Sequence, residues 1–319
     1  HNEDPSNSDK KFVPFIGITG FVRGSAYPQY HNVSSPAFAP YKNMTDDERN
    51  AYLASLAGHT TDWFDELFRT SISHKHHISL SGGGEKSNYY VSMGFENKNG
   101  LLKQNKVDSY HVNSTVGLIA SRKVDIDFYT NLSYVNGKEP SQSTDVFKYA
   151  FFANPYERPY NDDGSYRGDQ TYNMLTSANA QDNYAYPDNG FNLLRELNET
   201  SLTTKSFSAS ENVQFRWKII DDLSFAGTAA ISFNNHNSEG INGANTYTAF
   251  MDRPFEGGKT STSQRKYGSI NQSSSYSLGY TLRGQINYSK LSGTKHYVNA
   301  FAGSEISSTY LQSTYQKRY

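Results

Sequence analysis

Hydrophobic and polar residues alternate strictly through much of the chain from residue 76 onward. In residues 88–97, one parity holds four large apolar side chains: Tyr89, Val91, Met93 and Phe95. The residues between them are Tyr, Ser, Gly and Glu. A period of two residues indicates a β-strand whose two faces meet different surroundings.

The same alternation predicts eight strands, at residues 76–81, 88–97, 109–120, 124–136, 207–219, 223–233, 276–288 and 296–307. Most of them are ten to thirteen residues long. Strands of soluble proteins average about 5–6 residues, whereas a strand that crosses a bilayer needs about 9–11. Strand length therefore favours the wall of a membrane barrel.

The connections between these strands alternate between short and long. Short connections are expected at 82–87, 121–123, 220–222 and 291–295, and long ones at 98–106, 137–201 and 235–272. Short turns on one rim and long loops on the other are typical of outer-membrane barrels. We therefore expect residues 76–319 to form a barrel segment whose loops 137–201 and 235–272 are extracellular.

Residues 1–75 do not follow the two-residue period and are expected to form a loop and helical segment. Residues 12–22 could supply one strand, although Pro14 weakens that prediction. Thr45 and Glu48 have the spacing of a capping box, and Gly58 is placed to end the helix that follows. A second short helix is expected at 62–69, so the helical segment lies near 45–69.

The two faces of the strands differ in a way that suggests a membrane. The polar face is mostly Ser, Thr, Asn, Gln and Gly rather than Lys and Glu, which suits a wet, crowded interior. The apolar face is rich in Tyr, Phe and Trp near strand ends, as at a bilayer interface. Glu211 breaks this pattern: a bulge or register shift there would reconcile it with a lipid-facing side, and without one Glu211 counts against that assignment. The alternative is a soluble β-sandwich or solenoid whose apolar faces pack together.

Composition removes several other classes of protein. Aromatic residues make up 14% of the chain, which excludes a disordered segment. The net charge of −1 gives no electrostatic case for nucleic acid. There are no cysteines, so disulfides and thiolate metal sites are excluded. The longest uninterrupted apolar run, Tyr149–Ala153, is far shorter than the roughly 20 residues of a spanning helix.

Three motifs invite a chemical interpretation, but each has a simpler one. His74, His76 and His77 have no carboxylate close in sequence and are expected at a polar strand start rather than at a metal. Gly82–Gly84 leads into a strand and is expected to be a turn, not a phosphate cradle. Asn161–Gly164 lacks the spacing of a calcium loop, although weak calcium binding by acidic loop residues remains open. We expect no catalytic residues, no metal site and no other cofactor.

The loop 137–201 contains eleven aromatic residues, ten acidic residues and five basic residues. Aromatic faces combined with Asn, Asp and Arg suit the binding of a sugar or a peptide. The candidate ligand contacts are Tyr149, Phe152, Tyr156, Tyr160, Tyr166 and Tyr172. The alternative is that these rings pack the loop against its neighbours or a partner.

Four segments resemble a known family. They are TDWFDELFRT (61–70), HHISLSGGGEKSNYYVSMGFENKNGLL (76–102), ANPYERPYNDDGSY (153–166) and GQINYSKLSGTKHYVNAFAGSEIS (284–307). Together they are similar to the barrel of SusC/RagA-type TonB-dependent outer-membrane transporters of the Bacteroidetes. The resemblance implies a 22-stranded antiparallel transmembrane β-barrel, of which this chain would supply about eight consecutive strands. The plug domain and TonB box of that family have no counterpart in the chain.

The resemblance also implies a function. Such a protein would import an oligosaccharide or oligopeptide across the outer membrane and would not be an enzyme. Its partners would be a SusD-like surface lipoprotein, the TonB complex acting through a plug, the remainder of the same transporter and membrane lipid. The alternative from another class is a stand-alone outer-membrane or secreted β-barrel adhesin, and a soluble glycan-active enzyme ranks third.

Overall fold

The computed structural model describes residues 45–141, 144–168, 191–246, 248–249, 267–292 and 296–319. The strand expected at 12–22 lies outside the described residues.

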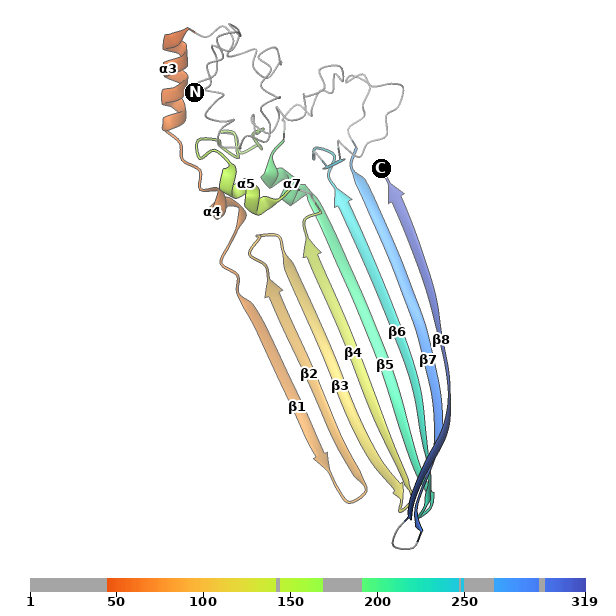
Figure 1. The fold of residues 1–319 in the computed structure, drawn as a ribbon. Coiled ribbons are helices and arrows are strands. Elements are labelled where there is room, and N and C mark those ends of the chain that lie inside the picture. Colours follow the sequence, from red (N-terminus) through yellow and green to blue (C-terminus); the bar gives the residue numbers. More distant parts are fainter. Residues whose placement is uncertain (1–44, 142–143, 169–190, 247, 250–266, 293–295) are drawn as a thin grey trace.

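Eight antiparallel strands form one continuous sheet, in which each strand pairs with its neighbours in sequence (Figure 1). The strands are β1 (Ser73–Gly83), β2 (Ser87–Asn99), β3 (Lys106–Ser121), β4 (Val124–Glu139), β5 (Thr200–Ile220), β6 (Leu223–Asn242), β7 (Ser269–Ser292) and β8 (His296–Arg318). Within the described residues, β1 and β8 remain the two edges of this sheet. The predicted all-β barrel wall is confirmed.

The strands are longer than the alternation alone predicted. β5 has 21 residues and β7 has 24, against a prediction of thirteen for each. Most of the difference arises at the loop-bearing end, where β7 begins at Ser269 rather than at Tyr276, while its other end extends from the predicted residue 288 to Ser292. The hydrogen-bonded ladder continues at the loop-bearing end, but the apolar residues that reveal a two-residue period do not.

All short connections lie at one end of the sheet, and the helices lie at the other (Figure 1). The predicted helix at 45–58 is α3 (Asp46–Ala57), and its Thr45–Glu48 capping box forms, with the Thr45 amide donating to Glu48 at 2.7 Å. The second predicted helix is α4 (Trp63–Leu67). Among the described residues, no helix is long and hydrophobic enough to cross a membrane.

Two further helices, α5 (Val146–Phe152) and α7 (Leu193–Glu199), lie in the connection that the sequence left without structure. Each begins at a side-chain cap. Asp145 accepts the Lys148 amide, and Asn192 accepts the Arg195 amide, both at 2.9 Å. Neither helix exceeds two turns, so no apolar period was long enough to predict it.

The two faces of the sheet reverse the usual arrangement of a soluble protein. We call the face that carries Met93, Tyr110 and Leu282 the outer face, and the opposite one the inner face. On β2, outer Met93 is 54% exposed while the adjacent inner Ser92 is 3% exposed. On β7, outer Leu282 is 53% exposed, while Gly279 on the inner face is buried. The polar face is the crowded one, and the described strands form no second sheet that could cover the apolar one.

An aromatic row crosses the outer face near the loop-bearing end. It consists of Phe95, Tyr110, Tyr134, Phe207, Phe233, Tyr276 and Tyr310, one from each strand from β2 to β8. Ring centroids along it lie 4.9 Å apart at Phe95–Tyr110 and 5.8 Å apart at Tyr276–Tyr310. Amphipathic rings at one level mark a membrane interface in barrel proteins.

A second group of rings, including Phe215, Trp217 and Phe225, lies toward the short turns. On β5, Phe207 and Trp217 share the outer face and are ten residues apart. At about 3.3 Å per residue and a tilt of about 40°, this separation spans roughly 25 Å along the barrel axis. An apolar band of about 25 Å is the height expected for an outer-membrane barrel.

No bulge or register shift occurs at Glu211, so this residue is an observation against a wholly apolar outer face. The ladder runs through without interruption, with Thr130 and Ile231 as the two cross-strand partners of Glu211. Glu211 therefore lies on the outer face, where its carboxylate accepts a hydrogen bond of 2.5 Å from the Thr130 hydroxyl. A local partner meets part of its polar requirement, so no change of register is needed.

The placement of the outer face can be tested with one charge. Leu282 lies midway between Tyr276 and Tyr288 on the outer face of β7, whereas Thr281 faces inward. In the complete protein in lipid vesicles, Leu282→Arg should lower the free energy of unfolding by about 2–4 kcal/mol, because an arginine at the bilayer midplane is poorly solvated. Thr281→Arg should cost less than about 1 kcal/mol.

Urea titration of the unchanged protein and both variants in vesicles measures their free energies of unfolding. Equal destabilisation, or a larger effect of Thr281→Arg, would contradict a hydrocarbon-facing outer surface.

Candidate functional site

A hydrophobic core forms at the loop-bearing end of the sheet, not between sheets. Helices α4, α5 and α7 supply its centre, with Trp63, Leu67 and Leu197 between 1% and 6% exposed. Phe191, which leads into α7, is fully buried among them. We call this group the rim core. It fixes segments far apart in sequence at the loop-bearing end of the strands.

Hydrogen bonds to backbone carbonyls attach the loop 153–168 to the rim core. The Trp63 indole donates to the Asn154 carbonyl at 2.9 Å in a buried position. Asn192 donates to the carbonyls of Pro159 and Arg167 at 2.8 and 2.7 Å. One amide side chain thus caps α7 and holds both sides of the turn between 159 and 167. These hydrogen bonds hold residues 153–168 in a defined conformation against the rim core.

The structure separates the predicted ligand contacts into different environments. Tyr149 is 7% exposed and packs edge-on against Trp63 at 5.4 Å, so it contributes to the rim core and offers little surface to a ligand. Tyr156 is half-buried, and Phe152 is 40% exposed and contacts Phe151. Tyr172 lies outside the described residues.

Tyr160 and Tyr166 form the most developed aromatic surface among the described loop residues. Their rings stack at 5.6 Å with an angle of 30°, and an antiparallel bridge joins their backbones. The Asn198 side chain at the end of α7 donates to the Tyr166 hydroxyl at 3.0 Å. The stack is therefore held from two sides while Tyr160 remains 37% exposed.

Tyr156 and Tyr160 have hydroxyls whose pKa is raised, so both keep their protons at neutral pH. Partial burial, reinforced by Tyr166 and Glu66, raises the pKa of the Tyr160 hydroxyl above its ordinary value. Burial, followed by the charge of Glu157, does the same to the pKa of Tyr156. Neutral phenols both donate and accept hydrogen bonds, and their rings cover apolar C–H surfaces. The surface suits a polar ligand with apolar faces.

A small polar pocket opens on the inner face near the loop-bearing end. Its volume is about 200 Å³, and its lining includes Asn242, Asn271, Ser273 and Tyr315. The Tyr315 hydroxyl donates to Asn271 at 3.2 Å, and the Asn242 amide donates to Ser269 at 3.0 Å. Uncharged hydrogen-bonding groups line the inner face here, as the polar parity predicted.

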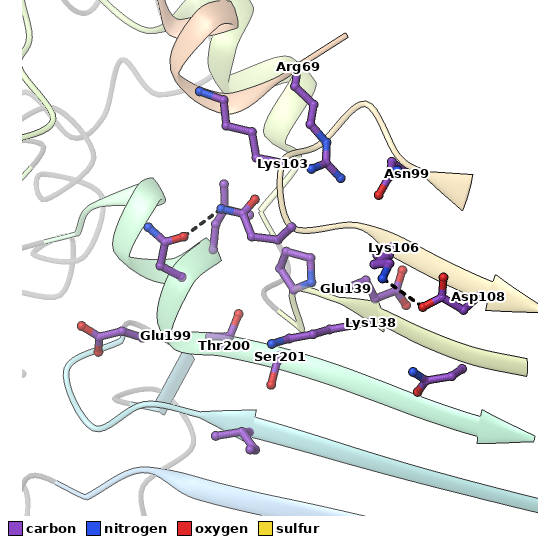
Figure 2. A pocket seen from close by; sticks show the side chains of 16 residues that line it. Arg69, Asn99, Lys103, Lys106, Asp108, Lys138, Glu139, Glu199, Thr200 and Ser201 are labelled. Atoms are coloured by element: carbon purple, nitrogen blue, oxygen red, sulfur yellow. Dashed lines mark hydrogen bonds and ion pairs between the residues drawn. The ribbon is translucent and has the colours of Figure 1, made fainter. Parts of the chain in front are cut away.

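A larger pocket of about 590 Å³ lies on the outer face, between the ends of the strands and α7 (Figure 2). Its lining contains four basic side chains: Arg69, Lys103, Lys106 and Lys138. Sequence reasoning did not single out these residues, because they come from β3, β4 and two separate connections. Only the register of the sheet brings them together.

The motifs weighed in the sequence behave as turns and strand positions. Gly84 closes the β1–β2 turn by donating to Ser87 at 2.7 Å. Gly164 takes a φ of +82° in a turn closed by its hydrogen bond to the Asn161 carbonyl at 3.0 Å. His76 stacks on Phe95 in the outer face. No group of three or more His, Asp or Glu side chains suited to a metal occurs in the described ranges. Weak calcium binding in the loop stays a prediction.

Comparison with known sequences gives relatives of one kind. No protein-family model matches the chain. The TonB-dependent receptor SusC of Bacteroides thetaiotaomicron is 28% identical over 225 residues, which cover 66% of this chain and 22% of the receptor. A TonB-dependent receptor of Formosa agariphila is 30% identical over 109 residues, covering 34% of this chain and 10% of the receptor. The chain resembles SusC/RagA-type TonB-dependent receptors. It spans less than a quarter of the length of these curated relatives.

Solved structures agree on the fold. A structure of the RagAB peptide transporter superposes with a TM-score of 0.58 at 15% identity, covering 82% of this chain and 27% of the other. The open-open state of the RagAB peptide importer also gives 0.58, at 14% identity, covering 99% of this chain and 37% of the other. The eight strands have the arrangement of part of such a barrel wall.

The link between Trp63 and Asn154 predicts a local effect on the loop 153–168. Trp63→Phe keeps most of the apolar area but removes the indole donor from the Asn154 carbonyl, which keeps the Glu157 amide at 3.1 Å. We expect local opening to become easier by about 0.5–1.5 kcal/mol, because the hydrogen bond between α4 and this loop is lost. Amide hydrogen exchange of the complete protein should show faster exchange in residues 153–160 and unchanged exchange in β5 and β6.

The matched control is Phe151→Leu, since Phe151 is 66% exposed and lies outside the rim core. If it loosened the loop as much as Trp63→Phe, the indole bond would not be what holds this segment.

Proposed function

We propose that this chain forms part of the wall of a TonB-dependent importer of the SusC/RagA type in the bacterial outer membrane. The observation that carries the proposal is the inverted sheet, whose apolar outer face is open while its polar inner face is crowded. An aromatic row at one level and an apolar band of about 25 Å suit a bilayer. The sequence relatives supply the class of protein, since they are TonB-dependent receptors.

The open edges favour a larger barrel over a stand-alone eight-stranded one. In a complete eight-stranded barrel β1 would pair with β8, whereas here each has one neighbour within the described part of the chain. An adhesin of eight strands would need that closure. Further strands of the same transporter would pair with both edges, and a plug inside the barrel would receive the pull of the TonB complex.

The substrate we propose is an oligosaccharide or an oligopeptide. The stacked pair Tyr160 and Tyr166 offers an aromatic face, and the inner-face pocket at Asn242 and Asn271 offers neutral donors and acceptors. Both lie toward the loop-bearing rim, where an external ligand enters. We further propose that a SusD-like lipoprotein covers this rim, as partner proteins do in two-component importers.

Energy-dependent uptake in the native bacterium tests the function. Cells that carry the complete protein are offered fluorescent malto-oligosaccharides and fluorescent oligopeptides. Removal of the gene should abolish uptake of at least one probe, and a protonophore should abolish the same uptake, because TonB-dependent transport draws on the proton gradient. If uptake of every probe survived both removal of the gene and the protonophore, the proposal that this protein is a TonB-dependent importer would be refuted.

The aromatic contact has its own test. Tyr160→Ala should raise the half-saturation concentration for the imported probe about threefold to tenfold, because an aromatic contact contributes roughly 0.5–1.5 kcal/mol. Tyr160→Phe keeps the ring and should behave like the unchanged protein. Phe147→Ala removes an exposed ring outside the stack and serves as the control. Equal effects of Tyr160→Ala and Phe147→Ala would count against the stack as a binding surface.

A further inference from the structure

The outer face changes its chemistry immediately beyond the aromatic row. On β4, Tyr134 is followed on the same face by Asn136 and then Lys138, at the end where the loops lie. On β3 the residues beyond Tyr110 on that face are Asp108 and Lys106. The strands continue, but the surface is no longer one that hydrocarbon could cover. The row therefore marks the level at which lipid tails give way to headgroups.

Three lysines gather at this level from three adjacent strands. Lys106 and Lys138 are direct cross-strand partners, and Lys205 lies opposite Asn136, one outer-face position closer to the row than Lys138. Two and four residues from the ring of their own strand correspond to about 7 and 13 Å along the strand. That is the depth of the polar headgroups just outside an apolar band.

The charges in this group are only partly compensated. Like charges directly opposite each other on one face of a sheet are destabilising. Lys106 has an ion pair with Asp108 at 3.1 Å. In the described part of the chain, neither Lys138 nor Lys205 has an ion pair. The nearby carboxylate of Glu239 accepts a hydrogen bond from Gln272 at 2.7 Å instead. An external anion would relieve the repulsion between the lysines.

The pocket above the lysines is lined by four basic side chains against three carboxylates, those of Asp108, Glu139 and Glu199. Arg69 donates to the carbonyls of Gly100 and Asn105, and Lys103 donates to that of Asp65, so neutral acceptors orient both cations without cancelling their charge. Figure 2 shows both around the same opening as Lys106 and Lys138, with Glu199 turned away from the lysines. Its volume of about 590 Å³ could hold a phosphorylated sugar.

We propose that Lys106, Lys138 and Lys205 bind the phosphorylated headgroup of a lipid in the loop-side leaflet, whose acyl chains lie on the apolar outer face below. A lipid is favoured over a free phosphate because the site continues directly into the hydrocarbon-facing band through Tyr110 and Tyr134. The inference rests on the membrane placement given under Proposed function, but not on import.

Native mass spectrometry of the complete protein in detergent, titrated with phosphorylated lipid A, tests this site. The variant Lys106→Gln/Lys138→Gln/Lys205→Gln should bind lipid A roughly a hundredfold more weakly, since each lysine near an anionic lipid contributes about a factor of five. The control Lys86→Gln/Lys123→Gln/Lys218→Gln removes the same charge at the short turns and should bind as the unchanged protein does.

Two further probes identify what is recognised. Dephosphorylated lipid A should bind weakly and equally to all three proteins, and inorganic phosphate should not compete at equal concentration. Competition by inorganic phosphate, or equal loss of lipid A in both triple variants, would overturn the proposal.

Insertion into vesicles is measured separately on a gel. A folded and inserted barrel migrates differently from the unfolded chain until the sample is heated. Failure of the unchanged protein to insert would refute the membrane wall itself. Insertion without lysine-dependent binding would refute only the lipid site.

Discussion

Backbone amides and carbonyls surrounded by hydrocarbon must find their hydrogen-bond partners within the protein, and side chains there must be apolar. With the proposed membrane placement, these two requirements explain most of the structure. Eight long antiparallel strands pair in sequence order, so every interior strand is satisfied on both sides. The apolar side chains then point away from the crowded face. A soluble sheet of this size would bury the same residues against a second layer.

In the proposed membrane placement, the limits of the hydrocarbon also set the positions of the other features. Tyr134 and Phe207 stand where the apolar band ends, and Lys138 and Lys205 follow on the same face. Beyond that level the protein meets water, and a conventional hydrophobic core becomes favourable again. The rim core around Trp63 and Leu197 forms there. Apolar side chains are therefore exposed on the strands on one side of the aromatic row and buried in the rim core on the other side.

Glu211 is a charged departure from the first rule on the outer face. It stays in register and shares a hydrogen bond with Thr130 on the neighbouring strand. A bulge would have moved the carboxylate to the inner face but would have broken the ladder in the middle of the band. Unpaired backbone groups cost more in hydrocarbon than a single locally bonded side chain, so the ladder is kept.

The sequence by itself determined the eight strands, their two faces and the alternation of short and long connections, because a two-residue period and aromatic strand ends are local signals. It also determined the Thr45–Glu48 cap. Only the tertiary structure decided that Tyr149 is a core residue while Tyr160 is open, because burial depends on α4 and α7, which lie far away in sequence. The grouping of Lys106, Lys138 and Lys205 is equally non-local. It follows from strand register, and register joins residues that no sequence pattern places together.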